Sequence, residues 1–303
     1  MIKEHALNQY RWVEIVNPQE AELTQVISKY QFPEKFKDYM MDRHEQPRAT
    51  FDALSNAGVL VVRALATDLD TAATTVPVFL GFNDDVLITA CHGQTLSKLI
   101  NQQASVTYST LSDHIFAILR AILRPYFDTL DVISQQAEQF AGHSRMNHIS
   151  NRRLAVITVL KTKLVYLRSA AAGNLVALQE LQDVLKQKLT MTADLSRQVS
   201  QQIADLVIEY RQCQSMFDVQ AGVVSETEAA YGNILNNRLN QTMKFLTVWS
   251  LVLAVPPIVS GFYGMNVKLP LADHSEAWLD TLVITLVLVL GMVILYLWQN
   301  KKQ

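Results

Sequence analysis

The sequence predicts an α+β domain, then a long helical stalk, then a two-helix C-terminal transmembrane hairpin. Residues 1–111 contain short apolar segments separated by turn-forming residues, which favours a mixed α/β domain. Residues 112–244 place apolar side chains every three or four positions, which favours helices. Residues 245–303 hold two uncharged stretches, each long enough to cross a bilayer core of about 30 Å.

Composition narrows the class of protein. Half of the 303 residues are hydrophobic and the net charge is −2, so neither nucleic acid nor a strongly anionic surface is an expected partner. The first ten residues are polar and charged, which excludes a secretory signal and predicts that the N-terminal part stays in the cytoplasm. Cys91 and Cys213 have no paired spacing, and we expect both to be buried thiols.

The first 111 residues should form strands with one early helix. Asn17 is a candidate N-cap for that helix, with Pro18 in its first turn. Residues 83–85, Asn-Asp-Asp, have the chemistry of a hairpin turn. The order of the strands cannot be derived from these signals. The expected strands are 10–16, 49–54, 58–65, 76–82 and 86–91.

The stalk should be built from several helices with continuous apolar stripes. No proline occurs between Pro125 and Pro256. Further helices are expected at 145–172 and 177–189. Thr192 is a candidate cap for a last helix, which runs into the first span over roughly 60 residues, or on the order of 100 Å, if Gly222 and Gly232 do not break it. The stripes consist of Ile115, Leu119, Ile122, Tyr126, Leu130 and Ile133, and then of Leu195, Val199, Ile203, Leu206, Tyr210, Cys213 and Phe217.

The two spans are expected at about 245–263 and 279–298, joined by an external loop. Trp278 and Trp298 stand where interfacial aromatic residues belong. Arg238 and Lys244 precede the first span, and Lys301 and Lys302 follow the second. The loop holds Lys268 beside Asp273 and Glu276, so the positive-inside rule places both chain termini in the cytoplasm.

One face of the first span is small or polar, whereas its other faces are bulky and apolar. A small-residue face favours close helix packing in membranes. Alternatively, several copies of the helix surround an aqueous path, with Asn240 at the inner end and Asn266 at the outer mouth. The face consists of Asn240, Met243, Thr247, Ser250, Ala254, Pro257 and Gly261.

The motif Tyr263-Gly264-Met265-Asn266 closes the first span, and residues 236–244, Asn-Asn-Arg-Leu-Asn-Gln-Thr-Met-Lys, precede it. In this position the motif resembles the CorA family of divalent-cation transporters. The resemblance implies a funnel-shaped homopentamer in the cell membrane that carries Mg²⁺ inward, with Co²⁺ and Ni²⁺ as further candidate ions. It implies that divalent metal ions, the lipid bilayer and other copies of the chain are the partners.

The resemblance also assigns a selectivity filter. Mg²⁺ sheds its waters reluctantly, so a filter should contact the hydrated ion through neutral oxygens. The Asn266 carbonyl, backed by the backbone of Gly264 and Met265, suits this role, with Tyr263 packing at the interface. The alternative for Asn266 is a helix C-cap.

Regulation by cytoplasmic Mg²⁺ follows only from the resemblance. In the family, intracellular Mg²⁺ bridges acidic residues between subunits and favours a closed state. Asp205 is the candidate on the stalk. Its partner could be any one of Asp68, Asp70, Asp84 and Asp85.

The chain departs from the family pattern in several places. Pro257 stands where many members have a pore hydroxyl residue. Lys268 follows the motif, where the usual acidic residue is missing, although Asp273 and Glu276 could restore attraction for cations. The C-terminal basic cluster is also short. These departures bear on ion preference and gating more than on the fold.

Two other functions remain open from the sequence. One is zinc transport, with or without proton coupling, by a branch of the family that usually varies the middle residue of the motif. Met265 argues against this branch. The other is a membrane-tethered structural stalk. There is no Walker loop, dinucleotide fingerprint or nucleophile elbow, so neither an ATPase nor another enzyme is expected. Cys91-His92 and the pair His143 and His148 lack the spacing of shared metal ligands.

Overall fold

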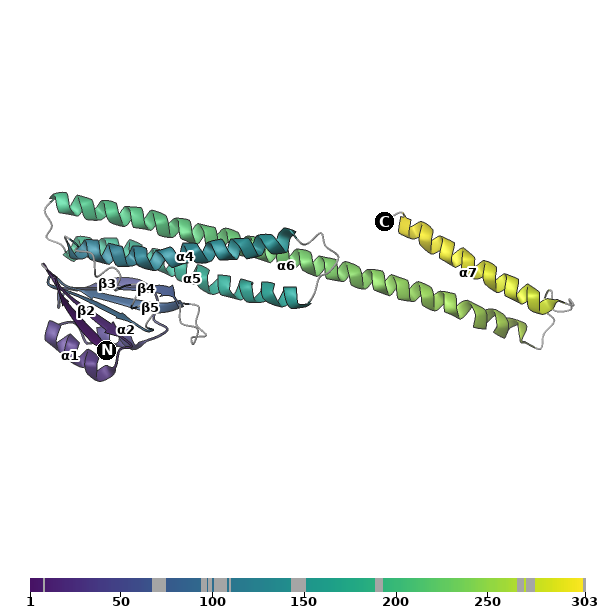
Figure 1. The fold of residues 1–303 in the computed structure, drawn as a ribbon, viewed down its shortest axis with the longest axis horizontal. Coiled ribbons are helices and arrows are strands. Elements are labelled where there is room, and N and C mark those ends of the chain that lie inside the picture. The colour runs from purple at the N-terminus through teal and green to yellow at the C-terminus, as the bar shows by residue number, and fades with distance from the viewer. Residues whose placement is uncertain are drawn as a thin grey trace. The chain divides into compact units, whose positions relative to one another are not determined.

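The structure is a computed structural model that describes residues 1–7, 9–66, 75–93, 97, 100, 108, 110–142, 151–188, 193–265, 270 and 276–301. It divides into two compact units, Met1–Glu228 and Ala229–Gln303. The first unit holds a sheet and several helices, and helix α6 continues from it into the second unit (Figure 1).

A six-stranded sheet organises the first unit, in the order β1-β2-β6-β5-β4-β3. Only the pair β2 and β6 is parallel, and the other neighbours are antiparallel. A parallel pair needs a long crossover, which here contains two helices and three further strands. The strands are β1 (Ile2–Ala6), β2 (Arg11–Val16), β3 (Arg48–Asp52), β4 (Ala57–Leu65), β5 (Thr75–Phe82) and β6 (Val86–Cys91).

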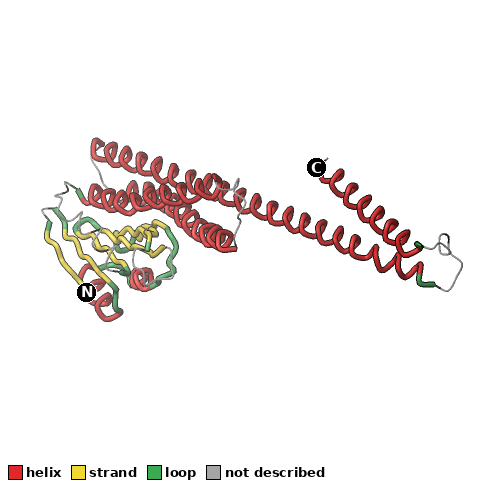
Figure 2. The backbone as a smooth tube through the Cα atoms, turned by 45° about the vertical axis from the view of Figure 1, so that its right-hand side comes forward, coloured by secondary structure: helices red, strands yellow, loops and turns green. Residues whose placement is uncertain are grey.

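Helices cover both faces of this sheet. Helices α1 (Glu20–Tyr30) and α2 (Lys35–Met41) lie on one face, and α4 (Leu111–Gly142) and α5 (Asn151–Lys188) lie on the other (Figures 1 and 2). Strands β4, β5 and β6 are buried along almost their whole length. This explains their continuous apolar runs, because a strand covered on both faces gains by burying every side chain.

The predicted strands are confirmed, and the turn at residues 83–85 is a hairpin turn. The Asn83 side-chain oxygen accepts hydrogen bonds from the backbone N–H groups of Asp85 (3.0 Å) and Val86 (2.8 Å). The edge strand β1 and the short helix α2 were not predicted, because β1 is polar and largely exposed and α2 has only 7 residues.

The predicted N-cap at Asn17 is wrong. Asn17 adopts a left-handed conformation (φ 49°), and Gln19 occupies the cap position of α1. The Asn17 side-chain oxygen instead accepts a hydrogen bond from the Gly93 backbone N–H at 3.0 Å. Asn17 therefore joins the end of β2 to the residues after β6, a contact between segments far apart in the sequence.

The two helices expected at 145–172 and 177–189 are one helix, α5. Gly173 does not break it. A Cβ atom at Gly173 would lie 2.9 Å from the Pro47 Cγ atom, so glycine permits a close approach between α5 and the segment before β3. The neighbouring Asn174 is fully buried and exchanges two hydrogen bonds with the Arg63 backbone, at 2.7 and 2.8 Å.

The long last helix is confirmed. Helix α6 (Ala193–Tyr263) has 71 residues, and at about 1.5 Å per residue it is on the order of 100 Å long. Gly222 and Gly232 do not interrupt it. The predicted stripes of α4 and α6 are buried, apart from Leu195, whose side chain lies outside the described part. The last helix is α7 (Ala277–Lys301).

Polar contacts hold the start of α6 to the other helices of the first unit. The Tyr210 hydroxyl donates to the Leu119 carbonyl at 2.9 Å, and the Gln202 amide donates to Asp113 at 3.0 Å. Arg168 and Asp218 form an ion pair between α5 and α6. These contacts join the three helices along the first unit.

Candidate functional site

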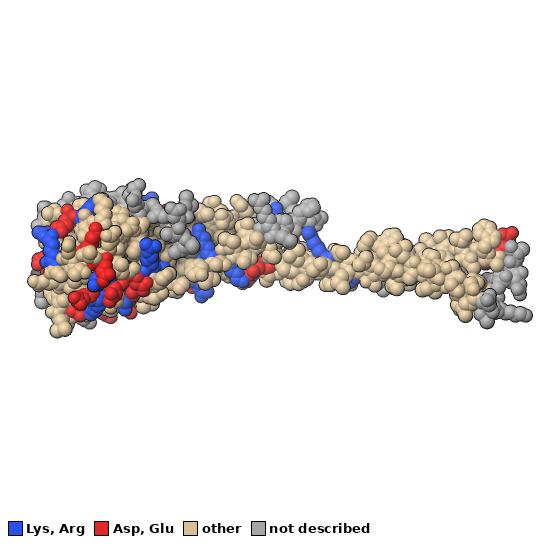
Figure 3. All heavy atoms as spheres, turned by 90° about the horizontal axis from the view of Figure 1, so that it is seen from below, with Lys and Arg blue, Asp and Glu red and all other residues tan. Residues whose placement is uncertain are grey.

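The second unit carries apolar side chains on its surface. Two helical segments, Arg197–Tyr263 and Ala277–Trp298, are long and apolar enough to cross a membrane by length and composition alone. Trp249 is 50% exposed, and Leu246 and Leu253 are 65% and 69% exposed. Among the described residues of α7, none is buried. On the face seen in Figure 3, charged side chains gather over the first unit and are scarce over the second. Such a surface needs lipid or another protein to cover it.

The small and polar face predicted for the first span lies on the unbroken helix α6. At 3.6 residues per turn, its seven residues fall within a stripe about 100° wide. Asn240, Met243, Thr247, Ser250, Pro257 and Gly261 are exposed, and Ala254 is partly exposed. We refer to these seven residues as the polar stripe.

The hydroxyl groups of the polar stripe donate to their own helix. The Thr247 hydroxyl donates to the Met243 carbonyl, and the Ser250 hydroxyl donates to the Leu246 carbonyl, each at 2.8 Å. Because the single hydrogen of each hydroxyl is engaged, the oxygen can only accept a further hydrogen bond. Acceptors suit the water molecules around a hydrated cation, which present their hydrogens outward.

Two consecutive prolines stand inside α6, Pro256 and Pro257. Proline has no N–H, so the carbonyls of Val252 and Leu253 lose their usual donors four residues later. The Ser260 hydroxyl donates to the Pro257 carbonyl at 3.3 Å. The helix nevertheless continues to Tyr263, past the two carbonyls that lose their usual donors.

The motif begins where α6 ends. The Gly264 N–H still donates to the Ser260 carbonyl at 2.9 Å, whereas the Met265 N–H donates to the Phe262 carbonyl at 3.4 Å, so the last turn tightens. A Cβ atom at Gly264 would lie 3.1 Å from the Ser260 carbonyl oxygen. The Tyr263 ring meets the Phe262 ring edge to face at 6.0 Å.

Several predicted residues lie outside the described part of the chain, and their roles stay predictions. For Asn266 this holds for both the filter role and the C-cap alternative. The residues concerned are Asp68, Asp70, His143, His148, Thr192, Asn266, Lys268, Asp273 and Lys302.

Asp205 lies on the exposed side of α6, away from its buried stripe. Asp84 accepts a hydrogen bond from the Asn56 amide at 3.0 Å, and Asp85 is exposed in the next position. Within the described residues, no group of three His, Cys, Asp or Glu side chains is arranged to hold a metal ion. A site at Asp205 would therefore need ligands from elsewhere in the chain or from another copy.

Both cysteines are buried, as expected, and neither forms a disulfide. Burial raises the pKa of the Cys91 and Cys213 thiols to about 12, so both remain neutral. His92 is half buried, and burial lowers its pKa.

Two polar features of the first unit were not predicted from the sequence. One surrounds His114, a fully buried residue directly before the apolar stripe of α4. The other is a pocket lined by Arg11, Lys29 and Tyr30. The placement of His114 among apolar residues was a usable signal, whereas the pocket depends on contacts between β2 and α1 that no local pattern reveals.

Three comparisons relate this chain to known proteins. A family model described as CorA-like Mg2+ transporter protein matches residues 8–302. The cobalt/magnesium transport protein CorA of Methanocaldococcus jannaschii is 24% identical over 317 residues, which cover 99% of this chain and 94% of that protein.

Solved structures share the fold. The complete CorA magnesium transporter of Methanocaldococcus jannaschii superposes with a TM-score of 0.78 at 21% identity, covering 97% of this chain and 92% of that one. The full-length CmaX protein gives a TM-score of 0.71 at 15% identity, over 98% and 90% of the two chains. The ZntB cytoplasmic domain of Vibrio parahaemolyticus gives 0.61 at 10% identity, over 76% and 90%.

Proposed function

The chain belongs to the family of CorA-like Mg2+ transporter proteins and is a divalent-cation transporter, and we propose that Mg²⁺ is the ion it carries into the cell. Co²⁺ and Ni²⁺ are further candidate ions. The observation that carries the proposal is helix α6, which runs unbroken from the first unit through the polar stripe to Tyr263. A helix that served only as a membrane tether would not need such a stripe.

The proposed filter is the segment from Tyr263 to Asn266. Mg²⁺ requires octahedral geometry and loses water reluctantly, so the filter binds the hydrated ion through the Asn266 side-chain oxygen. The close approach at Gly264 supports a narrow turn there, because a larger side chain would press on the Ser260 carbonyl. Carboxylates would bind the ion directly and slow its exit.

One pair of spans cannot enclose a pore, so we propose a homopentamer with a funnel-shaped soluble part. Each copy contributes its polar stripe to the wall of the path, with Asn240 at the cytoplasmic end. We propose that the transporter lies in the cell membrane with both chain termini in the cytoplasm. The positive-inside rule supports this orientation, because Arg238 and Lys244 precede the first span and Lys301 follows the second. The inward membrane potential then drives cation entry.

We further propose that cytoplasmic Mg²⁺ closes the transporter. Asp205 supplies one carboxylate, and its exposure on α6 leaves it accessible to a neighbouring copy. Among the described candidate partners, Asp85 is exposed, whereas Asp84 already bonds to Asn56. When Mg²⁺ is removed, carboxylates on adjacent copies repel each other and favour an open state.

Influx of Mg²⁺ into proteoliposomes containing a fluorescent indicator tests the function. We expect Asn266→Ala to reduce influx by at least about tenfold, because each neutral acceptor in a ring contributes about 0.5–1.5 kcal/mol. Asn237→Ala is the matched control, since Asn237 is exposed on α6 but lies outside the polar stripe. Wild-type influx in Asn266→Ala would contradict the filter.

The same assay separates the ions. Zinc and cobalt are added as competitors, with and without a pH gradient. Zn²⁺ entry that depends on the pH gradient, without Mg²⁺ entry, would replace the Mg²⁺ proposal by coupled zinc transport. Zinc is included because this chain shares the fold of the ZntB cytoplasmic domain. At 10% identity, this likeness concerns the fold alone.

A further inference from the structure

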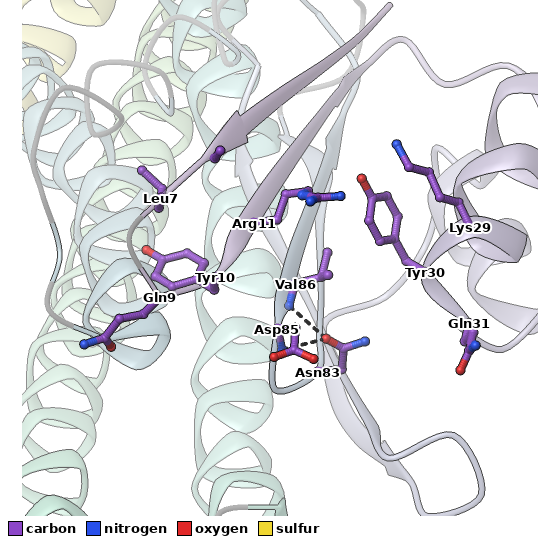
Figure 4. A pocket seen from close by; sticks show the side chains of 11 residues that line it. Leu7, Gln9, Tyr10, Arg11, Lys29, Tyr30, Gln31, Asn83, Asp85 and Val86 are labelled. Atoms are coloured by element: carbon purple, nitrogen blue, oxygen red, sulfur yellow. Dashed lines mark hydrogen bonds between the residues drawn. The ribbon is translucent and has the colours of Figure 1, made fainter.

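A pocket of about 610 Å³ opens at one end of the sheet in the first unit (Figure 4). It lies between the β1–β2 connection, the end of α1 and the turn from β5 to β6. Its volume falls within the range of about 300–1,000 Å³ that is usual for small-molecule sites. The lining is mainly polar, which indicates a polar occupant.

Two cations meet one aromatic ring at this pocket. The Arg11 guanidinium carbon lies 5.9 Å, and the Lys29 ammonium nitrogen 5.0 Å, from the centroid of the Tyr30 ring. Tyr30 is 9% exposed and belongs to the hydrophobic core, so the ring is a fixed platform. Its hydroxyl lies beside the Arg11 and Lys29 side chains. The ring holds both cations at the pocket by cation–π attraction.

The two cations differ in their partners. Lys29 forms an ion pair with Glu4 at 2.6 Å. Arg11 is exposed, and none of the described carboxylates lies within ion-pair distance of it. A guanidinium presents several N–H donors in a planar fork that matches a carboxylate or a phosphate. Arg11 is therefore the group that a bound anion would reach.

Acceptors also line the pocket. Asn83 and Asp85 lie below Arg11, Tyr30 and Lys29 in Figure 4. The Asp85 carboxylate is exposed, and an ionised carboxylate can only accept hydrogen bonds. The Asn83 side-chain oxygen accepts hydrogen bonds from the backbone N–H groups of Asp85 and Val86, and these bonds fix the turn. An anion alone would be repelled by Asp85, whereas a molecule with donors at its other end would be attracted.

We propose that this pocket binds a small organic anion, a carboxylate or phosphate ester, whose other end carries amino or hydroxyl groups. The anionic group bonds to Arg11, beside Lys29. The amino or hydroxyl groups donate to Asp85. The site is independent of the ion path and of the proposed transport function.

Calorimetric titration of the full chain in lipid nanodiscs tests the site with three probes. Glutamate combines a carboxylate with an amine, adenosine monophosphate combines a phosphate ester with hydroxyls, and inorganic phosphate offers an anion alone. We expect glutamate or adenosine monophosphate to bind saturably, and inorganic phosphate to bind more weakly than the organic probe that binds. Whichever of the first two binds identifies the source of the anion.

Variants then assign the residues. Arg11→Gln should weaken binding by about tenfold or more, because a charge-assisted hydrogen bond is lost. Asp85→Asn should weaken binding of the organic probe but not of phosphate. Arg43→Gln, at an exposed arginine outside the pocket lining, is the matched control and should bind as wild type does.

Two results would overturn the proposal. One is the absence of saturable binding for all three probes, and the other is unchanged affinity in Arg11→Gln. Lys29→Gln provides a second variant in case Arg11→Gln does not fold, and it should also weaken binding. Mg²⁺ influx measured on the same variants in proteoliposomes distinguishes failure of this site from failure of transport.

Discussion

At the scale of single residues, His114 shows how a buried polar side chain is accommodated. Its Nδ1 atom shares a hydrogen bond with the Tyr10 hydroxyl at 2.8 Å. The Tyr108 ring stacks on the imidazole at 4.7 Å, and Trp12 meets it edge to face at 4.9 Å. Burial lowers the pKa of His114 to about 4, so the imidazole is neutral in the folded protein.

This environment predicts a pH-dependent stability. The ordinary pKa of histidine is about 6.5, so between about pH 6.5 and pH 4 the unfolded chain binds a proton that the folded chain does not. Stability should therefore fall as the pH decreases through this window, by up to about 3 kcal/mol. The thermal unfolding midpoint of the full chain in detergent, followed by tryptophan fluorescence, measures the effect.

Replacement of the imidazole should remove this dependence. His114→Phe keeps an aromatic ring but does not titrate, so its midpoint should change less between pH 6.5 and 4, even though its stability is lower at neutral pH. His44→Gln is the control, because His44 is exposed, and it should retain the wild-type slope. An equal slope in His114→Phe would show that other groups cause the pH dependence.

At the scale of elements, α5 depends on one close contact. Gly173 faces Pro47, where any Cβ atom would approach the proline ring to 2.9 Å. Beside it, the Asn174 side-chain oxygen accepts a hydrogen bond from the Arg63 backbone N–H. Further along α5, the Glu180 carboxylate accepts a hydrogen bond from the Ala49 backbone N–H at 2.8 Å. These contacts fix α5 against β3 and β4.

Alanine at Gly173 should therefore destabilise the first unit. Overpacking of a tight contact costs about 1–3 kcal/mol, which should lower the thermal midpoint of the full chain. Gly222→Ala is the matched control in α6, since a Cβ atom there meets nothing within 4 Å. That variant should stabilise its helix by up to about 1 kcal/mol. Equal effects from the two variants would exclude the proline contact as the reason for Gly173.

At the scale of the whole molecule, the proposed pentamer accounts for side chains that are exposed in a single chain. The exposed apolar side chains of α6 and α7 need a bilayer or other copies, and Asp205 has no metal-binding group around it among the described residues. The proposed pentamer would place other copies of the chain beside both. Native mass spectrometry should give the mass of five chains of 34.1 kDa each.

Within that pentamer, Asp205→Asn should keep influx but lose its suppression by cytoplasmic Mg²⁺. The amide removes the negative charge that an ion would bridge. The measurement is influx at low and high Mg²⁺ on the side of the soluble unit. Glu226→Gln, another exposed carboxylate on α6, should remain suppressible. Normal suppression in Asp205→Asn would move the regulatory site to other carboxylates.

The sequence by itself determined the features that depend on local pattern. Apolar spacing predicted the stripes of α4 and α6, the uncharged stretches predicted helices able to span a membrane, and Asn83 predicted the β5–β6 turn. The helices, their buried stripes and this turn could be predicted because neighbours within one or two turns decide them. The motif after Phe262 was singled out by the resemblance to the CorA family, and its role stays a prediction.

Only the tertiary structure decided the features that join distant residues. The parallel pairing of β2 with β6, the continuity of α5 through Gly173 and the left-handed conformation of Asn17 each depend on a contact made elsewhere in the chain. Tyr10 and His114, which share a hydrogen bond, are 104 positions apart. Arg11, Lys29 and Tyr30 form one side of a pocket only because α1 packs near β2. Such contacts have no local period, so they follow from packing in three dimensions.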